Sequence, residues 1–325
     1  AREAAAGNAQ NTSSAMFYTD IFYAEKDKKG KWSIPVPVQG AVNTTYDEGA
    51  PYVTPDGCTM YYTSCKNFKN QSLGCRIYVC SQEEGIWGNP EEVVLFKDST
   101  VTVGHPCLSP DGKTLYFSSD YQEGSLGGRD IWKSTRTGKN TWSAPENLGS
   151  SVNSAGDDVY PFIADDGSLY FSTNGRGGLG GLDIFRFYKK DGESRTENLR
   201  YPINSAGDDF GFHLYKNFQR GYFSSNRDGS RGDDIYGFYM PPIEVNIEGV
   251  TKNEETTVVI ADASVQLTGS DGNQIESKSD KNGQFRFKLS ENIDYMFVAS
   301  KSGYLKGIAK ETTKGLTENT TLHIE

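Results

Sequence analysis

The fold class is decided by one stretch, Ser109-Pro110-Asp111-Gly112-Lys113-Thr114-Leu115-Tyr116-Phe117-Ser118-Ser119. Its Pro-Asp-Gly triplet is a turn signal, because proline presets φ and glycine tolerates the positive φ that many turns need. Two adjacent aromatic residues follow the turn, and strands favour such residues. The stretch therefore predicts a β-hairpin.

Copies of this hairpin signal recur at a nearly constant period. Equivalent turns lie 55 residues to either side, and a degenerate copy follows at Lys216-Asn217. Two other markers share the period, namely an isoleucine that precedes an aromatic residue, and Trp-x-x-Pro. The three markers fall at Pro55-Asp56-Gly57 and Asp165-Asp166-Gly167, at Ile21, Ile77, Ile131, Ile184 and Ile235, and at Trp32, Trp87 and Trp142. A unit of roughly 50 residues with about four short strands is typical of a β-propeller blade.

The markers also predict the number of blades. Residues 1–240 hold five isoleucine markers but only four hairpin turns. We therefore expect an all-β chain with a five-bladed β-propeller whose first blade lacks its inner strands; six blades is the alternative. The recurring aromatic residues are expected to pack blade against blade, since alternate side chains of a strand face opposite sides of its sheet.

The repeats stop at Met240-Pro241-Pro242. Beyond this point apolar and polar side chains alternate, as in Val245-Asn246-Ile247-Glu248-Gly249-Val250, which is the pattern of a half-buried strand. The loss of the repeats at a proline pair predicts a domain boundary. We expect a propeller at 1–240 and a second, smaller all-β domain at 241–325.

Composition agrees with an all-β chain and excludes some functions. The 325 residues include 36 Gly, 19 Tyr and 17 Phe but only 16 Leu. A net charge of −10 argues against nucleic-acid binding, because that affinity depends on clustered Lys and Arg. The sequence has no apolar run long enough for a transmembrane helix and no signal-peptide pattern at its start. We expect no transmembrane segment, and a chain that is a fragment of a longer protein.

Two sets of motifs resemble known families. Ser109 to Ser119 and Gly177-Gly178-Leu179-Gly180-Gly181-Leu182-Asp183-Ile184-Phe185 look like PD40, WD40-like repeats, which TolB propellers and OmpA-family envelope proteins share. The run Ser279-Asp280-Lys281-Asn282-Gly283-Gln284-Phe285-Arg286-Phe287 resembles the carboxypeptidase regulatory-like domain. That resemblance implies a small transthyretin-like β-sandwich for the second domain.

The order of the two domains is similar to that in OmpA-family envelope proteins, which include a component of the type IX secretion system. This resemblance implies a periplasmic lipoprotein that is associated with the outer membrane and works in protein transport. It implies protein partners in the cell envelope or the secretion machinery. It also implies a link to peptidoglycan through a downstream domain that this chain does not contain.

Acidic pairs recur where the innermost strand of a unit begins, and they form the candidate site. In a propeller these strand ends surround the central channel, and loops on a rigid scaffold often bind partners. The predicted partner-binding residues are Asp47, Glu48, His105, Asp157, Asp158, Asp208 and Asp209. Two alternatives stay open. The acids tie each unit to its neighbour through hydrogen bonds from backbone N–H groups, or they hold a structural Ca²⁺.

Four of the five cysteines fall in the second unit, which suits an oxidising compartment. Cys65 ends one strand and Cys75 precedes the next, so antiparallel pairing brings them within reach of a disulfide. We therefore predict a Cys65–Cys75 bridge. A second expectation is a Cys58–Cys80 bridge, which leaves Cys107 as the odd thiol. The alternative is five reduced cysteines.

No residue pattern in the sequence predicts catalysis. The three histidines lack the spacing of a metal site, and there is no nucleophile elbow or phosphate-binding loop. We therefore expect no catalytic residue, no metal and no cofactor, and a scaffold that binds other proteins. The alternative is a glycan- or muropeptide-binding module or a glycosidase, because five-bladed propellers host some glycosidases and these need only two placed carboxylates.

Overall fold

The structure, a computed structural model, describes residues 3–10, 17–68, 71–190, 192–215, 220–240, 242–316 and 319–324. All regular elements in these ranges are strands, so the all-β prediction is confirmed. The chain divides into two compact units, Ala1–Tyr239 and Met240–Glu325. None of the described residues forms a helix long and apolar enough to cross a membrane.

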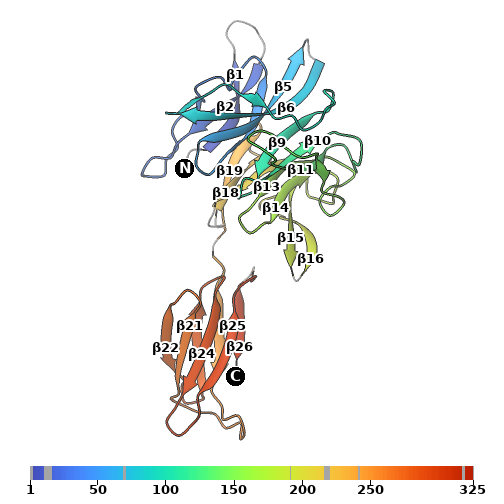
Figure 1. Cartoon of the computed structure of the whole chain (residues 1–325). Coiled ribbons are helices and arrows are strands. Elements are labelled where there is room, and N and C mark those ends of the chain that lie inside the picture. Colours follow the sequence, from blue (N-terminus) through green and yellow to red (C-terminus); the bar gives the residue numbers. More distant parts are fainter. Residues whose placement is uncertain are drawn as a thin grey trace. The chain divides into compact units, whose positions relative to one another are not determined.

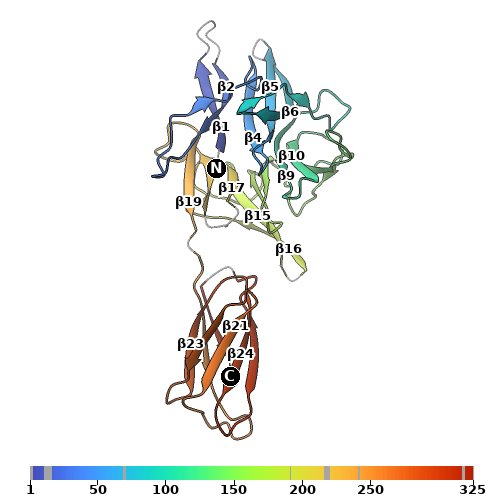
Figure 2. The same cartoon turned by 60° about the vertical axis from the view of Figure 1, so that its left-hand side comes forward.

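The first unit is built from five antiparallel sheets that follow one another along the chain around a common centre (Figures 1 and 2). We call them the first to fifth sheets. The first holds β1 (Glu3–Gln10), β2 (Phe17–Ala24) and β3 (Val36–Pro37). The second holds β4 (Asp47–Val53), β5 (Thr59–Phe68), β6 (Gln71–Glu83), β7 (Ile86–Trp87) and β8 (Glu91–Glu92). The third holds β9 (Val103–Leu108), β10 (Thr114–Ser119), β11 (Asp130–Thr135) and β12 (Glu146–Asn147).

The fourth and fifth sheets continue the pattern. The fourth holds β13 (Asp158–Ile163), β14 (Leu169–Thr173), β15 (Asp183–Lys190) and β16 (Glu193–Asn198). The fifth holds β17 (Asp209–Leu214), β18 (Arg220–Ser225) and β19 (Asp234–Tyr239). Strands β4, β9, β13 and β17 each begin their sheet, and each contacts the next of them in turn. This is the arrangement of a β-propeller, with these four as innermost strands.

The first sheet departs from the prediction. Its inner strands were expected to be missing, yet β1 pairs with β2 over eight residues, from Glu3 opposite Ala24 to Gln10 opposite Phe17. Because β2 carries the Ile21 marker that opens the third strand of the other sheets, β1 takes the place of their second strand. The sheet therefore lacks only the innermost strand among the described residues.

The isoleucine markers lie in the core of their sheets, with one exception. Ile21, Ile77, Ile131 and Ile184 are fully buried, whereas 55% of Ile235 is exposed. In the four buried cases a following segment covers the isoleucine, as where Leu199 N–H donates to the Ile184 carbonyl. The fifth sheet ends at β19 in the described part of the chain and has no such cover. The exposure follows from the missing outer strand.

The Trp-x-x-Pro marker contributes a contact between neighbouring sheets. Trp142 of the third sheet packs edge-on against Tyr61 of the second, with 6.4 Å between ring centroids. The Arg136 guanidinium stacks on Trp142 at 4.4 Å and donates a hydrogen bond of 3.0 Å to the Tyr61 hydroxyl. A cation that stacks on one aromatic ring and donates a hydrogen bond to the hydroxyl of the other thus joins consecutive sheets.

The same contact joins the first sheet to the fifth. Trp32 packs edge-on against Tyr222 with 6.0 Å between centroids. Lys26 Nζ lies 4.5 Å from the Trp32 ring and donates a 2.6 Å hydrogen bond to the Tyr222 hydroxyl. Since these residues occupy the same repeat positions as Trp142, Tyr61 and Arg136, the first and fifth sheets meet as consecutive sheets do.

The second unit has two sheets around one core. One of its sheets has the strand order β23–β20–β26, and the other has the order β22–β21–β24–β25. They share a buried cluster that includes Ile247, Leu267 and Phe287. Strands β20 and β26 run parallel, and the other pairs are antiparallel. The bounds are β20 Val245–Val250, β21 Ser264–Gly269, β22 Gln274–Lys278, β23 Gln284–Leu289, β24 Asp294–Ser300, β25 Gly307–Thr312 and β26 Thr320–Ile324.

Candidate functional site

The innermost strands give the propeller two ends. The acid end is where β4, β9, β13 and β17 begin, and it holds the predicted site residues. The turn end is where these strands finish, at the Pro-Asp-Gly turns and their equivalents. Each innermost strand also bulges against its partner, at residues with a positive φ. These residues are Ala50, His105, Tyr160 and Gly211, with φ of 46°, 54°, 52° and 65°.

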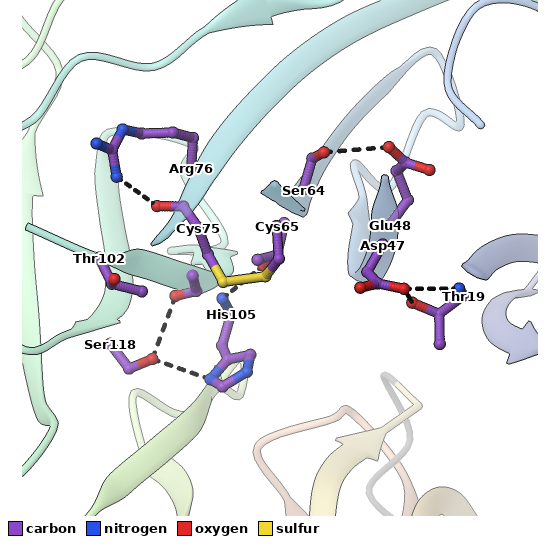
Figure 3. The surroundings of a disulfide bond; sticks show 12 residues. Thr19, Asp47, Glu48, Ser64, Cys65, Cys75, Arg76, Thr102, His105 and Ser118 are labelled. Carbon is purple, nitrogen blue, oxygen red and sulfur yellow. Dashed lines mark hydrogen bonds between the residues drawn. A yellow bond between two sulfur atoms is a disulfide. The ribbon is translucent and has the colours of Figure 1, made fainter. Parts of the chain in front are cut away.

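The first acid of each pair bonds to the preceding sheet. Its carboxylate accepts a hydrogen bond from a backbone N–H at or near the start of the strand that carries that sheet's isoleucine marker, and the acid itself is half-buried. The three donors are Thr19 N to Asp47 (3.0 Å), Arg129 N to Asp157 (2.9 Å) and Leu182 N to Asp208 (2.8 Å). The Thr19–Asp47 pair is visible in Figure 3.

The second acid of each pair is fully buried, with no exposed surface at Glu48, Asp158 or Asp209. Each accepts hydrogen bonds from the backbone N–H and the hydroxyl of the residue four positions earlier. These residues are Thr44 (2.9 and 2.6 Å), Ser154 (2.6 and 2.9 Å) and Ser205 (2.6 and 2.9 Å). Burial raises the pKa of Glu48 and Asp158, and hydrogen bonds from these neighbours oppose the rise.

The acid pairs pin the loop before each innermost strand and bind one sheet to the next, as the structural alternative describes. Three of the seven predicted partner-binding residues have no exposed surface, and partner binding at this end stays a prediction. The calcium alternative finds no support in the geometry. Within the described ranges, no group of three or more His, Cys, Asp or Glu side chains is placed to hold a metal ion.

His105 is also engaged within the fold. Its ring stacks on Tyr160, with 3.8 Å between centroids, and Tyr160 in turn packs against Phe210 at 4.9 Å. The His105 Nδ1 lies 2.9 Å from the Ser118 hydroxyl (Figure 3). Burial and, to a smaller extent, the Arg129 charge lower the pKa of His105 to about 3, so the ring is neutral at neutral pH. We conclude that it belongs to a stack that fills the channel near the acid end.

Cys65 and Cys75, the pair predicted from the sequence, are joined by a disulfide in the structure (Figure 3). They lie directly opposite each other in the pairing of β5 with β6. The bridge helps to line a small cavity of about 200 Å³ together with Thr102, His105 and Arg129. This cavity has little exposed polar surface and adjoins the tied acid end.

The second expected bridge is wrong. Cys58 and Cys80 are both free thiols, as is Cys107. The register places Met60, not Cys58, opposite Cys80. Cys58 instead lies in the preceding turn, where its Sγ is 3.5 Å from the Asp56 carbonyl oxygen. Cys58 is exposed and Cys80 buried, so the two side chains have different surroundings.

The turn end holds a cavity that the sequence reasoning missed. It has a volume of about 580 Å³ and receives residues from all five sheets. One residue from each sheet shows this: Tyr23, Tyr52, Leu108, Phe162 and His213. Tyr52, Phe162 and His213 occupy the same repeat position on their strands, which for Tyr52 and Phe162 is three residues before the turn. That shared position is the signal that could have pointed to this end of the channel.

Three acids line the cavity at its rim. Asp56, Glu84 and Asp165 are exposed, and none of them takes part in an ion pair with the described residues. Hydrogen bonds from the Thr54 hydroxyl and the Cys58 N–H lower the pKa of Asp56, which keeps it ionised. Carboxylates at the turn end thus stay available, unlike those at the acid end.

Comparison with known proteins gives fold likeness only. No protein-family model matches the chain, and no curated protein matches it in sequence. A TolB-like protein from Agrobacterium tumefaciens is 16% identical, with a TM-score of 0.41, over 84% of this chain and 86% of that one. An α-L-arabinofuranosidase from Lactobacillus brevis is 12% identical, with a TM-score of 0.46, over 78% and 91%.

A third neighbour, an endo-arabinase from Bacteroides thetaiotaomicron, is 13% identical, with a TM-score of 0.45, and covers 74% of this chain and 94% of its own. The three neighbours differ in the activities their names describe. We therefore argue the function from the residues of this chain.

Proposed function

We propose that this protein is a non-enzymatic scaffold of the bacterial periplasm whose five-bladed propeller binds another protein. One observation carries the proposal. The acids of the acid end hold neighbouring sheets together, whereas the turn end keeps a cavity of about 580 Å³ whose acids form no ion pair with the described residues. A rigid ring with one available opening suits binding, because binding residues concentrate on loops held by a scaffold.

The blade count rests on the repeated aromatic contact. Trp32 and Tyr222 meet as Trp142 and Tyr61 do, so the fifth sheet neighbours the first. The periplasmic location rests on the disulfide, because such bridges form and persist in oxidising compartments. The second unit, with sheets of three and four strands around a common core, suits a transthyretin-like sandwich that acts as a spacer or a second docking module.

A finer assignment rests on the motifs of the sequence. The PD40-like runs followed by the regulatory-like run are similar to the domain order of OmpA-family proteins, and particularly to the PorE component of the type IX secretion system. On this proposal the protein belongs to an outer-membrane-associated secretion complex. A downstream domain, outside this chain, would provide the link to peptidoglycan.

The proposal is tested by affinity capture from envelope extracts. The wild-type chain, purified with its disulfide intact, serves as bait beside the second unit alone. We expect one or a few envelope proteins to be captured by the full chain and not by the second unit. Capture of the same set by both baits, or of none by either, would count against a propeller scaffold.

A glycan ligand is the second candidate function. The turn-end cavity combines aromatic rings with carboxylates, which is also how a sugar ring can be held. Purified protein is screened against peptidoglycan fragments and arabinose-containing oligosaccharides by calorimetry and product analysis. Saturable binding or turnover there would replace the scaffold proposal with a carbohydrate-active one.

A further inference from the structure

The turn-end cavity has walls of a particular kind. Tyr52 and Phe162 come from the same position of the repeat, and Phe162 packs against His213 with 4.5 Å between ring centroids. Burial raises the pKa of the Tyr52 hydroxyl, and the Asp165 and Asp56 carboxylates nearby raise it further. The cavity is thus an aromatic chamber within electrostatic reach of two carboxylates.

The described charged side chains that line the chamber have one sign. Asp56, Glu84 and Asp165 line it, and its described lining includes neither lysine nor arginine. Although His213 opens onto the cavity, the surrounding protein lowers its pKa to about 4, so it adds no positive charge at neutral pH. A concave site lined by one sign of charge focuses its field and attracts ligands of the opposite sign.

The carboxylate oxygens that accept no hydrogen bond from the described residues restrict the class of ligand. Asp56 uses Oδ1 within its turn, and no described residue donates a hydrogen bond to its Oδ2 or to the carboxylates of Glu84 and Asp165. The Gln82 amide donates to the Gly57 carbonyl and is already engaged. Lysine and arginine side chains offer only donors, and aromatic faces attract their charge. A sugar hydroxyl is neutral, so the three carboxylates would not attract it as they attract a cation.

We propose that the turn-end cavity binds a lysine or arginine side chain presented by an extended segment of a protein partner. The inference rests on the proposed scaffold function and names the site and the chemistry of the partner. A volume of about 580 Å³ falls within the range of sites that enclose most of a drug-sized ligand. Such a space accommodates more than one residue, so a segment fits better than a lone small cation.

The test compares two triple variants with equal charge. The cavity variant carries Asp56→Asn, Glu84→Gln and Asp165→Asn. The control variant carries Asp111→Asn, Glu83→Gln and Asp228→Asn, which lie outside the cavity. Asp111 occupies the same turn position as Asp56 but faces Lys113, with 4.0 Å between Oδ2 and Nζ. Both variants change the net charge from −10 to −7 (−10 + 3), so non-specific attraction of a cationic peptide is the same.

The probe is a fluorescein-labelled peptide of glycine with two arginines, and fluorescence polarisation gives its Kd for each full-length protein. We expect saturable binding to the wild type, a Kd about tenfold or more higher for the cavity variant, and one within about twofold for the control. A matched peptide with glutamine in place of arginine should not bind. Equal weakening in both variants, or no saturable binding of the arginine peptide, would overturn the inference.

Two further measurements complete the test. The first distinguishes a peptide segment from a small cation, and the second distinguishes failure of this inference from failure of the scaffold proposal. If free argininamide competes as well as an arginine-containing peptide of equal concentration, the site takes a small cation and the protein-segment inference is wrong. Envelope capture is repeated with both variants as bait. Capture that survives in the cavity variant contradicts this site but leaves the scaffold proposal standing, whereas loss only in the cavity variant supports both.

Discussion

The two ends of the propeller use the same kind of residue in opposite ways. At the acid end Asp158 and Asp209 are fully buried and accept hydrogen bonds from the loops before their strands. At the turn end Asp56 and Asp165 are exposed and line a cavity. Burial explains the difference. The acids of the acid end are enclosed and bonded to neighbouring segments, whereas those at the turn end are exposed and form no ion pair with the described residues, so they stay available to a ligand.

The largest loss of stability that this comparison predicts follows from replacing Asp209. Its Oδ1 accepts a 2.6 Å hydrogen bond from the Arg227 guanidinium, which is itself mostly buried. Asp209→Ala leaves the guanidinium without its carboxylate partner and the Ser205 N–H without an acceptor, so we expect a loss of about 3–5 kcal/mol in the free energy of unfolding. Urea titration with an unchanged m-value measures it.

Asp228→Ala is the matched control for this prediction, because Asp228 is exposed and near Arg227 in sequence. It should leave the urea midpoint unchanged. If both variants shift equally, the acid end is not held by its buried acids, and the contrast between the two ends fails.

The disulfide gives the next largest effect. Cys65 and Cys75 close a loop of ten residues at the acid end. Replacing both by serine should lower the free energy of unfolding by about 2–3 kcal/mol, because the unfolded chain gains freedom that the bridge removes. Guanidinium unfolding of the wild type with and without reductant provides the comparison, and Cys58→Ser is the control. A double serine variant as stable as the wild type would show that the pairing of β5 with β6 holds this end unaided.

A smaller effect should appear as a pH dependence at the acid end. Burial raises the pKa of Asp158, and the nearby Asp130 carboxylate raises it further, although hydrogen bonds from Thr173 and Ser154 oppose the rise. The folded state therefore holds this proton more tightly than the unfolded state. Its contribution to the free energy of unfolding is complete below the pKa of Asp158 in the unfolded chain, which is about 4. This contribution is lost as pH rises through the pKa of Asp158 in the folded protein.

Asp158→Asn removes that titration and so isolates it. The stability of the wild type relative to Asp158→Asn should fall as pH rises from about 4 toward 7. Thermal unfolding of both proteins at matched ionic strength measures the difference. A difference that stays constant with pH, or that grows in the wild type's favour, contradicts a raised pKa at this position.

Much of the propeller was predictable because its signals are local and repeated. The turn at Asp111-Gly112, the buried isoleucines such as Ile131 and the facing cysteines Cys65 and Cys75 each follow from residue type and period. The first sheet was harder. Strand β1 carries none of the three markers, so only its pairing with β2 reveals it.

The roles of the acids were less predictable than their positions. Sequence alone left Asp157 and Asp158 with either a binding or a structural role, because the choice depends on whether a backbone N–H of another sheet lies within reach. The cavity itself could not be predicted, although the repeat position that Tyr52 and Phe162 share points to this end of the channel. It forms where five sheets meet, and whether a turn acid faces it depends on side-chain direction, which separates Asp56 from Asp111.

The smallest expected change in stability is that of the cavity variant, and it tests directly whether the turn-end acids support the fold. The cavity variant, with Asp56→Asn, Glu84→Gln and Asp165→Asn, should leave the urea midpoint unchanged. Asparagine keeps the Oδ1 acceptor that the Thr54 hydroxyl and the Cys58 N–H use in the turn. No ion pair of the described chain is lost at Glu84 or Asp165, and exposed substitutions of this kind usually have little effect. A marked fall in the midpoint would mean that acids support the fold at both ends, and a weaker Kd in that variant would then report damage to the ring.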